Sequence, residues 1–83
     1  MRMGNKMKLS EVKVYLEAFC ATNSVTVEII QARFGHRKFV ILRKRFAKEM
    51  SNKGYTLKVI ADAMHRDHTT IGYYVNGKGT ENG

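Results

Sequence analysis

The chain has 83 residues, and its 15 Lys and Arg against 7 Asp and Glu give a formal net charge of +8. A domain this small has a modest core with little room for an internal catalytic cleft, and its charge favours a polyanionic partner, nucleic acid first. Its apolar runs, such as FVIL at 39–42, fall far short of the roughly 20 residues that span a bilayer, so we expect a cytoplasmic protein without a membrane segment.

Apolar residues spaced by three and four, in a sequence without proline, predict an all-α domain of five helices over residues 10–76. The first helix begins after Ser10, whose side chain is expected to cap it, and ends near ATNS at 21–24. Its spacing predicts four buried side chains, Val12, Tyr15, Leu16 and Phe19. Residues 1–9 are expected to form a flexible basic arm, and the glycine-rich residues 77–83 a flexible tail.

A short second helix starts at Thr26 or just before and ends at RFGH, where Gly35 supplies either a C-cap or a turn, so residues 33–38 are expected to form a basic loop. The third helix runs from about Lys38 to Ser51, and NKG at 52–54 ends it. Its apolar stripe contains Phe39, Leu42, Phe46 and Met50. The opposite side carries basic residues without a matching row of acids, namely Arg37, Lys44 and Lys48. A solvated helix face usually mixes charges, so this side is a candidate surface for an anionic partner.

The last two predicted helices are short and follow each other closely. The first spans 56–64 with Thr56 as its cap, and it buries Leu57, Ile60, Ala61 and Met64. The second spans 67–76 with Asp67 at its N-cap, where the carboxylate is expected to accept from the amides of Thr69 or Thr70. Its apolar side contains Ile71, Tyr74 and Val75. Its other side is small and polar, and contains Thr69, Gly72, Tyr73 and Asn76.

Two short helices joined by a tight turn at His65 and Arg66 match a helix-turn-helix unit, whose second helix enters the major groove of DNA. The residue types suit that role, because a Thr methyl group packs against a thymine methyl group and a carboxylate accepts from cytosine N4. The residues expected to contact bases are Asp67, His68, Thr69, Tyr73 and Asn76. Those expected to contact the DNA backbone or the minor groove are Arg33, Arg37, Lys38, Lys44, Lys48, Arg66 and Thr70. If about five to seven phosphates are neutralised, log K is expected to fall against log salt with a slope of about −5 to −6.

Three stretches of this region resemble the C-terminal DNA-binding domain of the bacterial replication initiator DnaA, which has a Trp-repressor-like helix-turn-helix. They are FAKEM at 46–50, TLKVIADAM at 56–64 and above all RDHTTI at 66–71. The resemblance covers about residues 11–75, and it implies recognition of an origin or control of DNA replication. Because nothing upstream resembles the family's ATPase module, the chain is expected to be a stand-alone phage or plasmid protein that recognises an origin, a small regulator that uses the same sites, or a fragment of a larger protein.

Carried over by position, the resemblance implies that Asp67, His68 and Thr69 face bases in the major groove, with Thr70 and Lys48 near phosphates. The family's minor-groove arginine has its first counterpart in Arg33, with Arg37 as the rival. The basic loop is several residues shorter than in the family, so that arginine would enter the groove at a different offset. One residue is missing before Arg66, where MH replaces a Phe and two glycines, and the family's last helix usually continues beyond the position of Asn76. No G-x-x-x-x-G-K-[ST] motif occurs, so no nucleotide binding is expected.

The leading interpretation is sequence-specific binding to double-stranded DNA by a monomer, without a cofactor, a metal or an enzymatic activity. The alternative is a protein-interaction module that binds and inhibits a host replication initiator or polymerase, with Tyr73 and Tyr74 at the interface. A zinc site is disfavoured, because the clustered His65, Asp67 and His68 lack a fourth ligand and a nearby cysteine. RNA is disfavoured as well, because the A-form major groove is too narrow for a helix.

Overall fold

Threonine side chains cap two of the five helices, Thr26 at the start of the second and Thr56 at the start of the fourth, and the sequence predicts the cap at Thr56. The computed structural model describes residues 8–32 and 35–76, and these ranges contain no strand. The helices are α1 (Leu9–Thr22), α2 (Val27–Gln31), α3 (Arg37–Asn52), α4 (Leu57–Met64) and α5 (His68–Asn76). Thr26 Oγ1 accepts from the Ile29 amide at 3.1 Å, and Thr56 Oγ1 accepts from the Val59 amide at 3.2 Å. The prediction of an all-α domain with five helices is confirmed.

The start of α1 differs from the prediction. The helix begins at Leu9, and Lys8 at its N-cap makes no side-chain capping bond. Leu9 is partly buried against the core, whereas Ser10 is exposed, so packing draws the helix start upstream. The prediction that Ser10 caps α1 is therefore wrong. The remaining residues of the predicted arm and tail, 1–7 and 77–83, lie outside the described residues.

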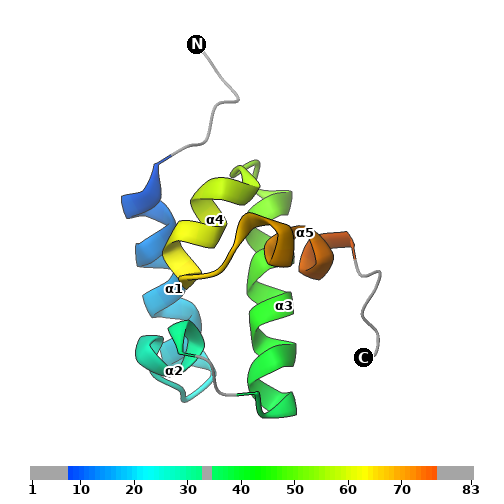
Figure 1. Cartoon of the computed structure of the whole chain (residues 1–83). Helices are drawn as coiled ribbons and strands as arrows, with labels where there is room; N and C mark the ends of the chain where they lie inside the picture. The colour runs from blue at the N-terminus through cyan, green and yellow to red at the C-terminus, as the bar shows by residue number, and fades with distance from the viewer. Residues whose placement is uncertain (1–7, 33–34, 77–83) are drawn as a thin grey trace.

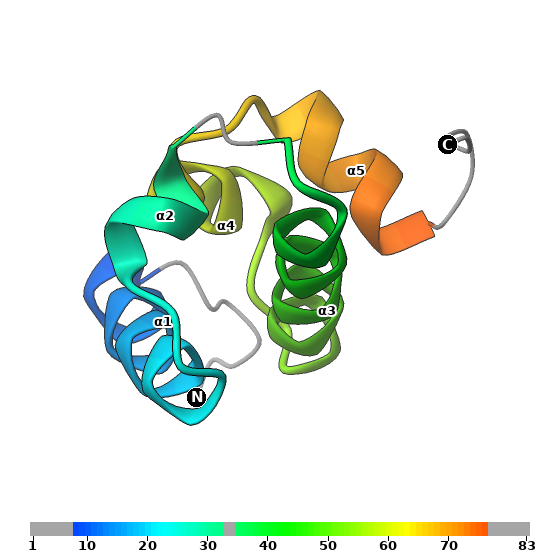
Figure 2. The same cartoon turned by 90° about the horizontal axis from the view of Figure 1, so that it is seen from below.

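The two long helices, α1 and α3, lie on either side of α4, and α5 packs on the side of α3 that faces away from α1 (Figures 1 and 2). The most extensive helix contacts are those of α3 with α5, α4 with α5, and α1 with α4. The core between them contains fully buried side chains from every helix, among them Leu16, Ile30, Phe46, Ile60, Met64 and Ile71. One side of α5 therefore rests on α3 and α4, and its other side is left to solvent.

Tyr15 is an exception among the predicted core residues. The buried stripe of α1 is formed by Val12, Leu16 and Cys20, and Tyr15 lies about 100° from Leu16 around the helix. Its side chain is 40% exposed, and its ring packs edge-on against Tyr55 with 6.2 Å between the ring centroids. The prediction that Tyr15 is buried is therefore wrong. Phe19 is partly buried, with its ring 5.3 Å from that of Phe46.

Three of the helices end on a residue with positive φ. These residues are Ser24 (φ 59°), Gly54 (φ 100°) and His65 (φ 56°). After each of them the chain makes the long hydrogen bond of a Schellman motif, for example from the Arg66 amide to the Ala61 carbonyl at 2.9 Å. The sequence signals the end at Gly54, which the structure confirms. His65 has a Cβ atom and therefore adopts this conformation at a cost in free energy.

We expect His65→Gly to raise the free energy of unfolding by about 0.5–1 kcal/mol, because glycine adopts positive φ without a steric penalty. Thermal and urea unfolding followed by circular dichroism measure the change. Lys58→Gly, at an exposed position within α4, is the matched control and should lower the free energy of unfolding by about 1 kcal/mol. A destabilised His65→Gly variant would show that the His65 side chain stabilises the turn.

Candidate nucleic-acid interface

The two sides of α5 differ as the sequence predicts. Ile71 is fully buried, and Tyr74 and Val75 are partly buried against the core. On the other side, Thr69 and Asn76 are exposed and Tyr73 is 56% exposed. Gly72 lies between the sides, and a Cβ atom there would be 3.8 Å from Leu57 Cδ1, so its lack of a side chain is not required by packing. The helix therefore presents hydroxyl and amide groups to the solvent.

Asp67 occupies the position before α5, but its side chain does not act as predicted. Its backbone carbonyl accepts from the Ile71 amide at 3.2 Å, which closes the first turn of α5. Within the described residues, the Asp67 carboxylate accepts no hydrogen bond, so the predicted bonds from Thr69 and Thr70 are absent. Asp67 and His68 are both exposed, and Thr70 is half-buried. The carboxylate is therefore available to an external donor.

A hollow of about 460 Å³ lies where α4 turns into α5. It is lined by Lys58, Ala61, Asp62, Arg66, Asp67 and His68. Its lining thus combines both signs of charge with an imidazole, directly beside the first turn of α5. Within residues 8–32 and 35–76 no three His, Cys, Asp or Glu side chains are grouped so that they could hold a metal ion.

The basic side of α3 continues the exposed surface beside α5. Arg37, Lys38 and Lys48 are exposed and Lys44 is half-buried. At 100° per residue, Arg37, Lys44 and Lys48 fall within an arc of about 40°. Phe46 contacts Phe19 of α1, and Lys44 lies about 160° from Phe46 around the helix, away from α1. Figure 2 shows that α5 also packs on the side of α3 away from α1. Three cations therefore lie along the flank of α3 next to α5.

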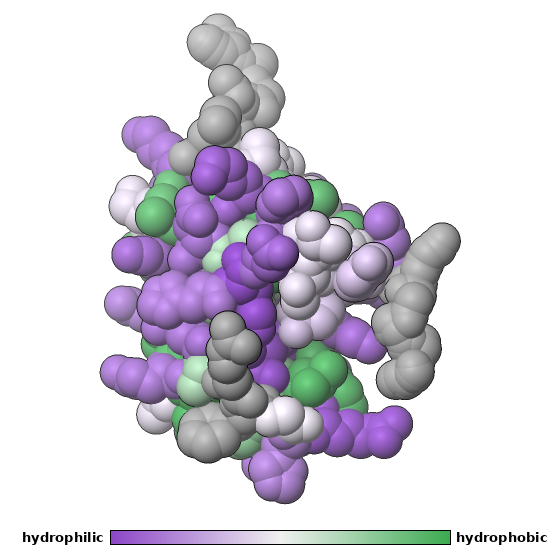
Figure 3. Space-filling view, in the orientation of Figure 1, coloured by the Kyte–Doolittle hydropathy of each residue, from purple (hydrophilic) through white to green (hydrophobic). Residues whose placement is uncertain are grey.

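The space-filling view shows hydrophilic side chains over much of this face of the molecule (Figure 3). A paler area, neither strongly hydrophilic nor strongly hydrophobic, lies where Figure 1 places α5. This agrees with the exposed threonine and tyrosine side chains of that helix. Arg33, the first counterpart of a minor-groove arginine, lies outside the described residues.

Arg43 is buried, with 2% of its surface exposed, and the sequence interpretation assigned it no role. Its Nε donates to the Ile30 carbonyl at 3.0 Å, and its Nη2 donates to the carbonyls of Ile29 and Ala32, each at 3.1 Å. These are carbonyls at the C-terminal end of α2, where a helix lacks partners of its own and carries partial negative charge. The sequence spacing already indicates that Arg43 is buried, because Arg43 lies about 20° from Met50 on the apolar side of α3.

Arg66 binds the same helix end from the turn between α4 and α5. Its Nη1 donates to the Gln31 carbonyl at 3.1 Å, and its Nη2 donates to the Ala32 carbonyl. In the opposite direction, Gln31 Nε2 donates to the Ala63 carbonyl at 2.9 Å. The role of Arg66 as a phosphate contact stays a prediction, and within the described residues its Nη1 and Nη2 donate to backbone carbonyls.

The guanidinium group of Arg66 is close enough to Arg43 to affect the pKa of Arg43. Burial lowers the pKa of Arg43, the positive charge of Arg66 lowers it further, and Tyr74 raises it. An arginine stays protonated at neutral pH all the same. Two cations therefore meet at the Ala32 carbonyl, and helix-end carbonyls rather than carboxylates compensate for their burial.

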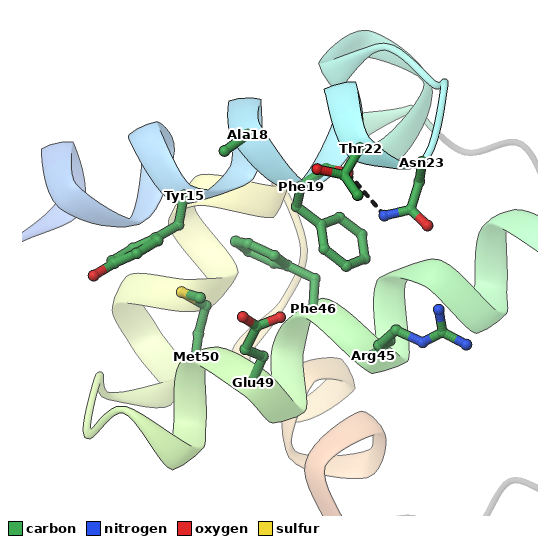
Figure 4. A pocket seen from close by; sticks show the side chains of 9 residues that line it. All are labelled: Tyr15, Ala18, Phe19, Thr22, Asn23, Arg45, Phe46, Glu49 and Met50. Carbon is green, nitrogen blue, oxygen red and sulfur yellow. Dashed lines mark hydrogen bonds between the residues drawn. The ribbon is translucent and has the colours of Figure 1, made fainter.

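A second hollow, of about 380 Å³, lies between α1 and α3, away from α5 (Figure 4). The rings of Tyr15, Phe19 and Phe46 line it, with Arg45 and Glu49 from α3 at its edge. Val14, in the same stretch of α1, is 65% exposed. Three aromatic rings thus line this hollow, and the sequence interpretation assigned it no role.

Comparison of the chain with family models, with curated proteins and with solved structures finds no match. No helix among the described residues has the length and apolar character that crossing a membrane requires. The resemblance to the DnaA domain therefore rests on the three stretches FAKEM, TLKVIADAM and RDHTTI alone, and the function that it implies is a proposal.

Proposed function

We propose that this protein binds double-stranded DNA in a sequence-specific manner, with α5 in the major groove. The observation that carries the proposal is the exposed polar side of α5, flanked by the cations of α3. A helix with one side packed and the other lined by short polar side chains fits the groove and leaves hydrogen-bonding groups for base edges. A binding role also fits the two hollows described above, which are open at the surface.

The proposed base contacts are Asp67, His68, Thr69, Tyr73 and Asn76, and all five are exposed. Thr69 offers a methyl group to thymine and a hydroxyl to either kind of base pair, and Asn76 suits adenine. The Asp67 carboxylate accepts no hydrogen bond from the amides of α5, so both of its oxygens can accept from cytosine N4. The proposed backbone contacts are Arg37, Lys38, Lys44, Lys48 and Thr70.

Binding to duplex DNA is expected to depend steeply on salt. Four cations that each neutralise one phosphate predict a slope of log K against log salt of about −4. Lys48→Ala should weaken binding to every duplex similarly and should reduce the steepness of the slope by about 1. Lys13→Ala is the matched control, because Lys13 is an exposed lysine of α1, and it should change neither quantity. Fluorescence anisotropy between 50 and 300 mM salt measures both; a slope near zero would contradict the proposal.

We further propose, from the resemblance to the DnaA domain, that the DNA is an origin or another site that controls replication. RDHTTI at 66–71 carries this proposal, since it places the matching residues at the start of α5. The domain would act as a monomer without nucleotide. Footprinting on the replication origin of the genome that encodes the chain tests this, and an origin without a protected site would contradict it.

The second candidate function is binding to a replication protein, and the aromatic hollow between α1 and α3 favours it. Aromatic side chains are enriched at protein interfaces, and this hollow is separate from the side of α5 proposed to contact DNA (Figure 4). Tyr73 offers a second exposed ring, whereas its neighbour Tyr74 is half-buried. Co-purification of an initiator or polymerase that survives nuclease treatment and is lost in Tyr15→Ala would favour this function.

A further inference from the structure

The first turn of α5 has no apolar anchor of its own. Asp67, His68 and Thr69 are exposed, and the first fully buried side chain of the helix is Ile71. The turn before it contains no glycine, and His65 adopts φ 56° and ψ 45° there. Packing of Ile71 and of the residues after it holds the rest of α5, so the first turn itself depends on contacts other than the burial of its own side chains.

Arg66 supplies such contacts through hydrogen bonds over a long stretch of the sequence. Its guanidinium reaches the carbonyls of Gln31 and Ala32, and Nη1 also lies 3.3 Å from the His65 carbonyl and 3.4 Å from that of Met64. One side chain thus joins the end of α4, the start of α5 and the end of α2. The planar fork of an arginine can satisfy two neighbouring carbonyls together, which a lysine ammonium cannot do in the same geometry.

The end of α2 is itself fixed. Arg43, buried in the core, binds the carbonyls of Ile29, Ile30 and Ala32, and the Ala32 carbonyl is shared by both arginines. A continuous set of contacts therefore runs from the core through the end of α2 to the turn before α5. Recognition side chains need such a supporting layer, because small displacements weaken directional hydrogen bonds.

We propose that Arg66 is a positioning residue for base recognition and not a phosphate ligand: by holding the turn on the end of α2, it sets the orientation of Asp67, His68 and Thr69. This inference rests on the proposed function for its DNA readout. It separates Arg66 from Arg37, Lys44 and Lys48, whose charges lie on the exposed flank of α3.

The test compares Arg66→Gln and Arg66→Lys with wild type. Lys58→Gln is the matched control, because Lys58 lines the same hollow and makes no hydrogen bond to the end of α2. We expect both Arg66 variants to lower the ratio of affinities for the selected and a scrambled duplex by about tenfold, the size of one lost base-pair readout, with an unchanged salt slope. Lys58→Gln should keep the ratio. An Arg66→Lys variant that keeps the ratio, or a salt slope that loses about 1 in Arg66→Gln, would overturn the proposal in favour of a phosphate contact.

A measurement without DNA separates this inference from the proposed function. The Ile71 amide donates to the Asp67 carbonyl and reports on the first turn of α5. The Ile60 amide donates to the Thr56 carbonyl at 3.1 Å and reports on α4. Amide hydrogen exchange should become about tenfold faster at Ile71 in both Arg66 variants and stay unchanged at Ile60. Unchanged exchange at Ile71, or equal acceleration at both amides, would overturn the positioning role even if the domain binds DNA. If the wild-type chain selects no DNA site but the Arg66 variants show faster exchange at Ile71, the proposed function is contradicted. The role of Arg66 in holding the turn is then still supported.

Discussion

Replacing Arg43 with methionine is expected to lower the free energy of unfolding by about 3 kcal/mol. The substitution keeps most of the apolar side-chain volume but removes the donors to Ile29 and Ile30. Those carbonyls would lose the donors of Arg43 at a helix end, and each buried polar group left unsatisfied costs about 1–3 kcal/mol. Relief from burying a positive charge offsets part of this cost. Urea unfolding followed by circular dichroism measures the change.

Arg45→Met provides the control for that prediction. Arg45 lies two residues further along α3 and is exposed, so its replacement should change stability by less than about 0.5 kcal/mol. Equal stability of the two variants would show that the carbonyl contacts of Arg43 contribute nothing to the fold. It would also show that Arg43 does not fix the end of α2, to which Arg66 binds.

The largest expected effect on function is that of His68→Ala combined with Thr69→Ala. Each base contact is worth about 1–3 kcal/mol of discrimination, so losing two should lower the preference for the selected site by about 100-fold. Binding to unrelated duplexes should persist, because the cations of α3 are unchanged. Since both side chains are exposed, stability should change by less than about 0.5 kcal/mol. Competition between the selected and a scrambled duplex measures the preference.

Thr22→Ala is the matched control, because it removes an exposed threonine at the end of α1. Its site preference should equal that of wild type. Full discrimination in the variant that lacks both His68 and Thr69 side chains would contradict the assignment of base contacts. DNA binding as such would then have to be attributed to another surface.

Local chemistry explains which parts of the fold the sequence predicts. The cap at Thr56 and the end at Gly54 depend on residues within one helical turn, and both predictions are confirmed. The two sides of α5 follow from a spacing of three and four residues in the same way. The predictions that Ser10 caps α1 and that Tyr15 is buried are wrong, because packing against distant residues determines both. Leu9 packs against the core, so the helix starts before Ser10, and Cys20 belongs to the buried stripe that excludes Tyr15.

The arginines show where such reasoning ends. Composition places Arg43 and Arg66 among 15 basic residues, and a basic residue is exposed by default. Both bind carbonyls at the end of α2, which lie between 11 and 35 residues away in the sequence. Every residue has a backbone carbonyl, so the residue types do not indicate which carbonyl an arginine binds, and only the folded structure identifies these contacts. The absence of a side-chain cap from Asp67 likewise depends on a rotamer that its residue type does not fix.

Selection from a random duplex library, followed by sequencing of the bound pool, tests the central claim most directly. We predict one enriched motif for the wild-type chain, with positions that lose information when the exposed side chains at the start of α5 are removed. A bound pool as random as the starting library would contradict sequence-specific recognition, whatever the affinity of the protein for DNA.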